Sequence, residues 1–259
     1  MSRLFTARLS LITAAALAAS PAFAQVKTDG EWRGMGGLAF SSTSGNSTST
    51  ALALNADMAR ATVQDKITLG ASSNYARSKA NGTTSTTSNK WGSFGQYDYN
   101  LSSSTYLFGK LAAEGDALTE LTLRTTLAGG LGVKLVDTKE NSFNVFGGAA
   151  YTTDRYDTAQ TIGGRVSKTF NRSSLLLGEE SSHQLASNTS FKQRLELYPG
   201  LSGDKAFLAK FSAGLAVAVS SNLNTTIGLT DSFNSKPPAG AKKNDLGLFM
   251  GVSVKFGAS

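Results

Sequence analysis

LTLRTTLAGGLGVKLV, running from Leu121 to Val136, alternates apolar side chains with small or polar ones along most of its length. Successive side chains of a β-strand point to opposite faces, so the leucines from Leu123 to Leu135 share one face. The other face carries Arg124 and a lysine among threonines and glycines. The stretch therefore predicts a strand with an oily surface on one side and a polar surface on the other.

The same alternation recurs along nearly the whole chain, in segments of about 10 to 15 residues separated by turn-forming clusters. We find about twelve such segments. They lie near 31–42, 50–62, 65–78, 90–101, 104–117, 120–136, 142–155, 173–186, 190–201, 205–220, 222–234 and 244–257. The repetition predicts an all-β chain of consecutive antiparallel strands.

Segment length distinguishes two folds that alternation alone leaves open, a soluble sandwich and a membrane barrel. Soluble strands usually run about five or six residues, whereas membrane-spanning strands need about 9 to 11, and the segments here fit the longer figure. A sheet in lipid must pair all its peptide groups, so it closes on itself. The sequence predicts a transmembrane antiparallel up-and-down β-barrel of about 12 strands, with about 10 or 14 as the nearest alternatives.

The amino-terminal segment Met1 to Ala24 has the features of a cleaved export signal. Arginines precede an apolar run of about fifteen residues, and its end, Ala22-Phe23-Ala24, fits the small-x-small pattern that signal peptidase cuts. A spanning helix would need roughly 20 residues. We expect a signal peptide here and one barrel over 25–259, in the outer membrane of a Gram-negative bacterium.

The carboxyl-terminal stretch LGLFMGVSVKFGAS, Leu246 to Ser259, places its larger apolar side chains on every second position up to Phe256. It resembles the C-terminal assembly signal of outer-membrane barrels, in which the final strand ends on an aromatic residue. Here Gly257, Ala258 and Ser259 follow that aromatic residue. The resemblance implies that the barrel assembly machinery recognises this strand, with outer-membrane lipids as the surrounding partner.

Connection lengths predict how the barrel is oriented, because periplasmic turns are short. The connections on the side of both termini are short, near 63–66, 102–104, 138–141, 186–190 and 220–222. The opposite side has longer loops at 43–49, 79–89, Tyr156 to Arg172 and 235–243. Both termini should therefore face the periplasm.

Aromatic residues near segment ends are typical of the girdles that barrels place at the two membrane interfaces. They are Trp32, Trp91, Tyr99, Tyr106, Phe143, Tyr151, Phe207 and Phe256. Together they favour a membrane barrel over a soluble sheet.

Five stretches carry a family resemblance. They are GGLAFSSTSGNSTSTAL near the start, QYDYNLS at 96–102, LRTTLAGGLGVKL at 123–135, LLLGEESSHQLASNTSFKQRLELYPGLS at 175–202 and DSFNSKPPAGAKKND at 231–245. In these stretches the chain resembles the bacterial salt-induced outer-membrane proteins, a domain of unknown function. The resemblance implies an outer-membrane barrel linked to salt or osmotic stress, and it brings no established reaction or ligand.

Charged side chains that alternation turns inward form the candidate functional set. A Lys or Arg that faces lipid near the midplane costs about 2–4 kcal/mol, which favours an inward position. The predicted lumen-lining charges are Asp57, Asp98, Lys110, Glu114, Asp116, Arg124, Lys134, Glu180, Arg194, Glu196 and Lys210, with Lys192 in the same set. They fit either a structural network of neutralising charges or a pore that selects solutes by size and charge.

We expect a passive, weakly selective small-solute channel or an envelope-integrity protein, since such a barrel is wider than an eight-stranded one that its side chains nearly fill. One alternative is a structural or surface-interaction barrel without transport. Another is a membrane-embedded lipid hydrolase, whose serine would need the only histidine, His183, beside Ser181 and Ser182. Serine is so common here that this proximity carries little weight, and we expect no enzyme activity.

The segment 173–186 leaves its register open. Leu177 shares a face with Glu179, and Leu176 shares the opposite face with Glu180. Either register therefore turns a carboxylate towards lipid, unless a bulge intervenes.

Composition argues against several other classes. The chain has no cysteine and one histidine, which disfavours disulfides and zinc. Its Lys and Arg are dispersed, which disfavours nucleic acid. Asp154 and Asp157 in an outer loop could approach a calcium ion, but TTDRYD lacks the ligand density of a calcium loop. We expect no cofactor, metal or nucleic-acid partner.

Overall fold

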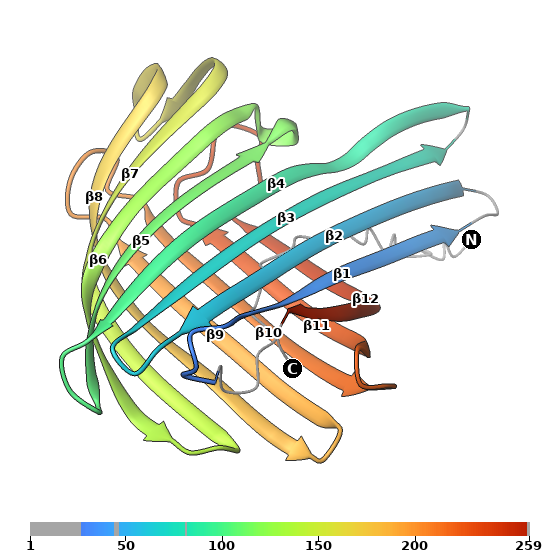
Figure 1. The fold of residues 1–259 in the computed structure, drawn as a ribbon. Coiled ribbons are helices and arrows are strands. Elements are labelled where there is room, and N and C mark those ends of the chain that lie inside the picture. Colours follow the sequence, from blue (N-terminus) through green and yellow to red (C-terminus); the bar gives the residue numbers. More distant parts are fainter. Residues whose placement is uncertain (1–26, 44–46, 81, 258–259) are drawn as a thin grey trace, which may run out of the picture.

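Twelve antiparallel strands make up the chain in the computed structural model, which describes residues 27–43, 47–80 and 82–257 (Figure 1). The predicted signal peptide, Met1 to Ala24, lies outside the described residues. The strands are β1 (Trp32–Thr43), β2 (Ser47–Ala61), β3 (Asp65–Ala80), β4 (Thr83–Asn100), β5 (Thr105–Asp116), β6 (Leu121–Asp137), β7 (Asn141–Ile162), β8 (Arg165–Ala186), β9 (Thr189–Pro199), β10 (Phe207–Ala218), β11 (Leu223–Asn234) and β12 (Asn244–Gly257). A single turn of 3-10 helix, η1 (Ala117–Thr119), joins β5 to β6.

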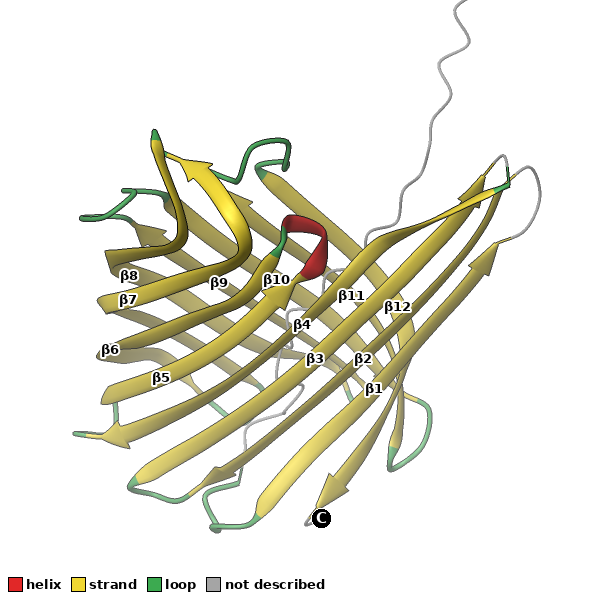
Figure 2. Cartoon of the chain, turned by 90° about the horizontal axis from the view of Figure 1, so that it is seen from above, coloured by secondary structure: helices red, strands yellow, loops and turns green. Residues whose placement is uncertain are grey.

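Each strand pairs with its neighbours in sequence, and β1 also pairs with β12, so the sheet closes into a barrel. Figure 2 shows the strands running obliquely around it. The prediction of a twelve-stranded antiparallel up-and-down barrel is confirmed. Within the described residues, no helix has the length and apolarity to cross a membrane. We call the end that holds residues 27 and 257 the terminal end, and the opposite end the distal end.

Several strands extend further at the distal end than the sequence predicts. β7 and β8 each run for 22 residues, and their pairing continues to Ile162 and Arg165. The prediction of a loop from Tyr156 to Arg172 is therefore wrong, as is that of a loop over 79–89, where β3 and β4 pair. Outside the membrane, backbone pairing suffices to hold a hairpin and no oily face is required, so these extensions lack the alternation that marks a spanning strand.

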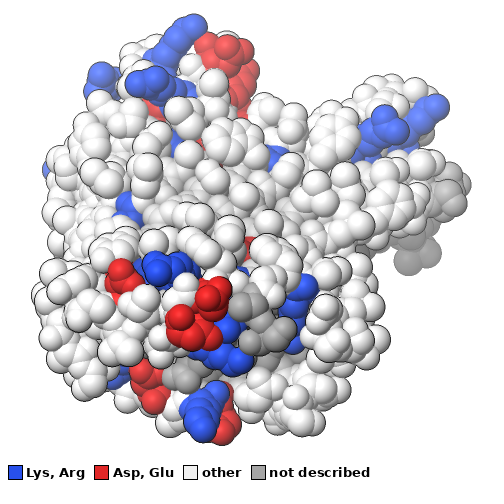
Figure 3. Space-filling view, viewed as in Figure 1, with Lys and Arg blue, Asp and Glu red and all other residues white. Residues whose placement is uncertain are grey.

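The two faces of the barrel differ as alternation predicts. Apolar side chains stand exposed on the outer wall, among them Leu107, Leu111, Leu127, Leu131, Leu246, Leu248 and Met250. Figure 3 shows Lys, Arg, Asp and Glu gathered near the ends and mouth of the barrel, with much of the visible wall between them uncharged. This distribution suits a surface that contacts hydrocarbon.

The structure settles the register of 173–186 without a bulge in its central part. Glu180 pairs with Arg194 on β9 and lies in the lumen, while Leu175 and Leu177 are exposed on the outer face. Glu179 shares that outer face, and the side chain of Gln193 donates a hydrogen bond to it at 3.0 Å. The outward carboxylate is thus held by a neighbouring polar group.

Part of the barrel interior is apolar, which the sequence did not lead us to expect. A buried cluster projects from β5 to β10 and consists of Tyr106, Phe108, Ala128, Phe146, Ala150, Leu176, Tyr198 and Leu208. We call it the lumen cluster. Tyr106 therefore turns inward, and its prediction as a girdle residue is wrong because its face of β5 points into the lumen.

Glycines let β6 and β7 approach closely beside the lumen cluster. A Cβ added at Gly148 would lie 2.1 Å from the carbonyl oxygen of Gly129, and one at Gly130 would lie 2.1 Å from that of Gly147. No side chain fits at such a separation. The glycines of the LAGGLG stretch are therefore a packing requirement of the barrel wall.

Candidate functional site

The predicted charges converge on the barrel interior. Those that line its main cavity are Asp98, Lys110, Glu114, Arg124, Lys134, Glu180, Lys192, Arg194, Glu196 and Lys210. Asp57 is buried on β2 beside Gly70 of β3, and Asp116 lies at the distal end of β5. The interior therefore holds many charged side chains of both signs. The contacts among these side chains determine what the site can do.

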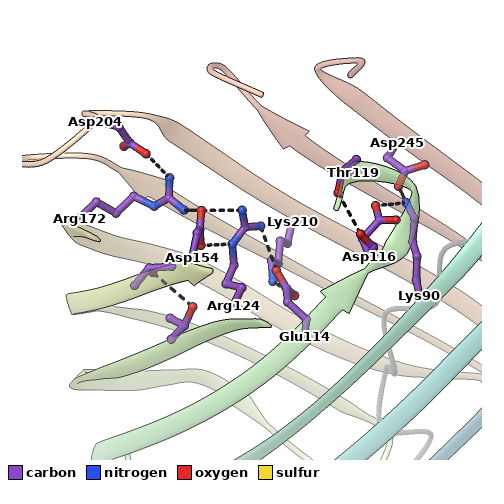
Figure 4. Close-up of polar contacts among 12 residues, drawn as sticks. Lys90, Glu114, Asp116, Thr119, Arg124, Asp154, Arg172, Asp204, Lys210 and Asp245 are labelled. Carbon is purple, nitrogen blue, oxygen red and sulfur yellow. Dashed lines mark hydrogen bonds and ion pairs between the residues drawn. The ribbon is translucent and has the colours of Figure 1, made fainter. Parts of the chain in front are cut away.

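A chain of alternating charges follows the distal half of the lumen (Figure 4). We call it the distal chain, and its members in order are Asp204, Arg172, Asp154, Arg124, Glu114 and Lys210. Arg124 holds Asp154 with two nitrogens, at 2.6 and 2.9 Å, and this bidentate geometry is the strongest form of the pair. Each inner member contacts two opposite charges, so the chain is neutralised along its length.

The last link of the distal chain crosses the lumen. Glu114 projects from β5 and Lys210 from β10, strands that are not neighbours in the barrel. The Lys210 ammonium nevertheless lies 2.6 Å from the Glu114 carboxylate. About 30% of each side chain remains accessible, 31% for Lys210 and 28% for Glu114. This link is a partly hydrated bar across the interior.

A second group of charges lies deeper and also crosses the lumen. Lys110 on β5 contacts Glu196 on β9 at 2.6 Å. Arg194 contacts the same Glu196 at 2.7 Å, forms an ion pair with Glu180, and donates to Gln96 of β4 at 3.2 Å. We call this group the central cluster. Lys110 and Glu196 are 11% and 6% accessible, so this bar is drier than that between Glu114 and Lys210.

A third contact spans the barrel at the distal rim. Lys90 of β4 lies 3.5 Å from Asp116 of β5 and forms a close ion pair with Asp245 of β12 (Figure 4). Since β4 and β12 are separated by three strands, this lysine also links opposite parts of the wall.

Aromatic rings lie against two cations of the central cluster, one ring from the lumen cluster and one from β4. The Arg194 guanidinium lies 4.9 Å from the ring centre of Phe146, and the Lys110 ammonium lies 5.5 Å from that of Phe94. Cations are attracted to the faces of aromatic rings, and apolar neighbours lower the local dielectric, which strengthens each ion pair. The aromatic rings therefore stabilise the cations that cross the lumen.

A cavity of 770 Å³ extends from the terminal end of the lumen, and residues of the central cluster and of the Glu114–Lys210 bar line it. Lys27, Thr62 and Lys139 line it at the terminal end, and Glu114 and Lys210 line it at its deep end. Small residues of β3 and β4, such as Gly70 and Gly92, form its side opposite the lumen cluster, and their size leaves the space open. The cavity is a vestibule whose floor is the Glu114–Lys210 bar.

The distal chain contains residues that sequence reasoning missed or misplaced. Asp154, which was expected in an outer loop, lies in β7, is 1% exposed, and is bound by two arginines. That expectation is wrong because β7 continues past it. Arg172 fell in a predicted loop for the same reason, and Lys90 and Asp245 stood at predicted strand ends. Asp154 falls on the inward face of the predicted strand 142–155, and inward alternation extended by one residue from the strand 173–186 would have included Arg172.

His183 lies outside the lumen, near the terminal end of β8. Its Nδ1 is 2.9 Å from the side-chain oxygen of Asn141, and its ring stacks on Phe191 at 6.5 Å. Ser182 points away from it and lines the cavity. Among the described residues, no group of three or more His, Cys, Asp or Glu side chains could hold a metal ion.

This architecture, an oily closed barrel around an ionic lumen, defines an outer-membrane β-barrel of the porin-like class. The chain belongs to the family described as "Protein of unknown function, DUF481", which matches residues 36–256. No curated protein matches it significantly by sequence.

Solved structures similar to the chain are outer-membrane barrels. The outer membrane channel COG4313 from Pseudomonas putida F1 has a TM-score of 0.50 at 11% identity, over 92% of this chain and 100% of that one. The NanC porin has a TM-score of 0.46 at 12% identity, over 86% of this chain and 97% of that one. At such identities the likeness shows the fold alone.

Proposed function

We propose that this protein is a passive, weakly selective channel for small solutes, whose lumen is narrowed by ion pairs that cross it. The observation that carries the proposal is the 770 Å³ vestibule, which ends at the Glu114–Lys210 bar. A barrel with a purely structural interior would gain from a filled lumen, since interiors are normally close-packed. An open, charged vestibule is instead suited to hydrated solutes.

The outer membrane is the proposed location, with the terminal end and its vestibule facing the periplasm. The connections at that end are short, as periplasmic turns usually are, and the long β7–β8 hairpin lies at the other end. Solutes that enter from outside would then meet the rim contact of Lys90 first, the distal chain next, and the vestibule last.

The accessibility of the Glu114–Lys210 ion pair connects the proposed channel to salt stress. Added salt shortens the Debye length from about 10 Å at 0.1 M to about 3 Å at 1 M, and it weakens accessible ion pairs more than buried ones. The Glu114–Lys210 pair is more accessible than the Lys110–Glu196 pair. High salt should therefore loosen this bar first and widen the path.

Single-channel recording in planar bilayers tests the proposal. Purified barrel should give stable conductance steps, and the step size between 0.1 and 1 M KCl should rise more steeply than the conductivity of the solution. The double variant Glu114→Gln/Lys210→Gln is the matched control, and its step size should simply follow solution conductivity. Folded protein that inserts and stays silent at both concentrations contradicts the channel and favours a structural barrel.

A weak preference for anions should accompany conduction. Nine Lys and Arg side chains and six Asp and Glu side chains line the vestibule, which leaves a modest positive excess. Under a tenfold KCl gradient, the reversal potential should have the sign of chloride selectivity and a magnitude well below the ideal value of about 59 mV. A potential of the opposite sign would show that the lining does not set selectivity.

A further inference from the structure

The strands β1 to β4 continue at the distal end as a projecting sheet. β3 and β4 stay paired as far as Ala80 with Thr83, and β2 stays paired with β3 as far as Ser47. Figure 1 shows the ends of β3 and β4 standing clear of β5 and β6. We call this sheet the distal arm, and it consists of residues 41–43, 47–50, 77–80 and 83–87.

Directly below the distal arm, the outer face of the barrel ends in an oily row. Phe40 of β1 is level with Leu52 of β2, which is level with Tyr75 of β3. These side chains are 64%, 37% and 44% exposed. The outward side chains of β3 from Ile67 to Tyr75 cover about nine residues, which is the length that a spanning strand needs. Tyr75 therefore lies at the distal boundary of the hydrocarbon, where barrels place aromatic residues.

The next two rows of the same outer face are cationic and carry hydroxyl groups. They are centred on Arg77 and Lys79, which are both exposed and follow Tyr75 in the outward alternation of β3. Rows on one face of a strand are about 7 Å apart, so the wall changes from oily to cationic within one step. A threonine flanks each cation on either side, and the two rows are Thr50–Arg77–Thr86 and Thr48–Lys79–Thr84.

The charge of the distal arm is of one sign. The chain contains no Asp or Glu in 41–54 or in 73–90. Within the part of the chain that the structure describes, neither Arg77 nor Lys79 forms an ion pair. Figure 3 shows Lys and Arg, and no Asp or Glu, on the visible part of the molecule that projects with β3 and β4. The outer face of the arm is therefore complementary to an anionic ligand.

A membrane lipid that carries phosphate matches both parts of this face. Its acyl chains would contact the oily row, and its phosphate oxygens would reach the cations one step further out. Arginine binds phosphate through two parallel hydrogen bonds, and lysine and threonine side chains supply further donors. Basic groups beside a bilayer are also attracted to anionic lipids. A soluble anion would use the cations and leave the oily row without a role.

We propose that the outer face of the distal arm binds the phosphate-bearing headgroup of an anionic lipid in the surrounding leaflet. Arg77 and Lys79 hold the phosphate oxygens, and the row of Phe40, Leu52 and Tyr75 contacts the acyl chains of the same lipid. The inference rests on the proposed membrane location. It does not depend on ion conduction, so the channel and the lipid site can fail separately.

The fluorescence of Trp91 tests the proposal. Trp91 lies on the same outer face, level with Ser73 and about 13 Å nearer the membrane centre than the row of Arg77. Trp32→Phe leaves it as the only tryptophan. In phosphatidylcholine vesicles, phosphatidic acid with a doxyl label on its acyl chain should quench Trp91 at least twice as strongly as doxyl-labelled phosphatidylcholine at the same mole fraction. Equal quenching by the two lipids would overturn the proposal.

Two double variants with the same change of charge separate a local site from general attraction. Arg77→Gln/Lys79→Gln should abolish the excess quenching by phosphatidic acid. Arg155→Gln/Lys168→Gln removes two exposed cations from the distal ends of β7 and β8 and should retain the excess. An equal loss in both variants, or a retained excess in the first, would contradict binding at the distal arm.

Competition distinguishes a lipid headgroup from a soluble anion. Unlabelled diphosphoryl lipid A in the vesicles should remove the excess quenching, because it offers phosphate at the same depth. Inorganic phosphate in the buffer should leave the excess unchanged. Failure of lipid A to compete, or competition by inorganic phosphate, would contradict a lipid phosphate as the occupant.

Discussion

At the scale of the residue, the interior depends on charges that each serve more than one partner. Arg124 binds Asp154 and Glu114, and Arg172 binds Asp154 and Asp204. Removing one partner of a buried pair leaves an uncompensated charge, which costs more than the pair itself contributes. A single substitution in the distal chain should therefore affect both its neighbours.

Arg124→Met should lower the free energy of unfolding by about 3–5 kcal/mol, because Asp154 and Glu114 both lose a cationic partner in a poorly hydrated place. Urea unfolding in lipid vesicles, followed by tryptophan fluorescence, measures the loss. The exposed Arg77 of the β3–β4 hairpin is the matched control. Arg77→Met should change stability by less than about 0.5 kcal/mol. Equal stability of both variants would mean that the distal chain contributes little.

The ion pair between Glu114 and Lys210 predicts that the effects of the two residues on conductance are coupled. Glu114→Gln or Lys210→Gln alone should raise single-channel conductance in 0.1 M KCl, since either change breaks the bar. The double variant should exceed the larger single effect only slightly, because residues that act as a pair are not additive. Lys79→Gln, at an exposed outer position, should leave conductance unchanged. Additive effects of the two substitutions would show that each residue acts alone.

At the scale of the element, the wall is shaped by where strands approach and where they part. β6 and β7 meet through glycines, and the ladder between β1 and β12 ends at Leu38 and Val252. Bulges shift the register of β6 between Leu121 and Leu123, which turns Leu121 from the outer face into a buried position. Such local features set the cross-section of the lumen.

Gly148→Ala tests the close approach of β6 and β7. Its Cβ would meet the carbonyl oxygen of Gly129 at 2.1 Å, so the backbones must separate. The cost should be about 1–3 kcal/mol of unfolding free energy, as for other overpacked sites. Gly109→Ala is the control, since a Cβ there meets nothing within 4 Å. A Gly148→Ala variant as stable as the Gly109→Ala variant would show that the wall adapts freely.

Much of the fold could be predicted from alternation, because spanning strands must present one oily face throughout. The β7–β8 extension could not be, since Gln160 and Thr161 lie in a hairpin that backbone pairing holds without an oily face. The lumen charges could be assigned to the inner face, because spanning strands turn their oily face outward. That Lys110 meets Glu196 could not be foreseen, because alternation gives the face of a residue and not which distant strand stands opposite.

At the scale of the whole molecule, the barrel has two unlike halves. The interior along β5 to β10 is filled by the lumen cluster and the central charges, while the interior along β3 and β4 carries small residues beside the vestibule. Two side chains of β4 join the halves: Lys90 forms an ion pair with Asp116 of β5, and Gln96 accepts a hydrogen bond from Arg194 of β9. The result is a path along one side of the barrel, narrowed at the distal chain.

Thiol accessibility of single-cysteine variants in liposomes tests the central claim most directly, since the natural chain contributes no cysteine background. Ala112→Cys and Thr126→Cys line the vestibule and should react with a water-soluble, charged methanethiosulfonate. Their chain neighbours Leu111→Cys and Leu127→Cys face outward and should resist it, reacting only with a lipid-soluble maleimide. Aqueous reaction at the two leucine positions, with protection at Ala112 and Thr126, would contradict an oily barrel built around a wet, ion-paired lumen.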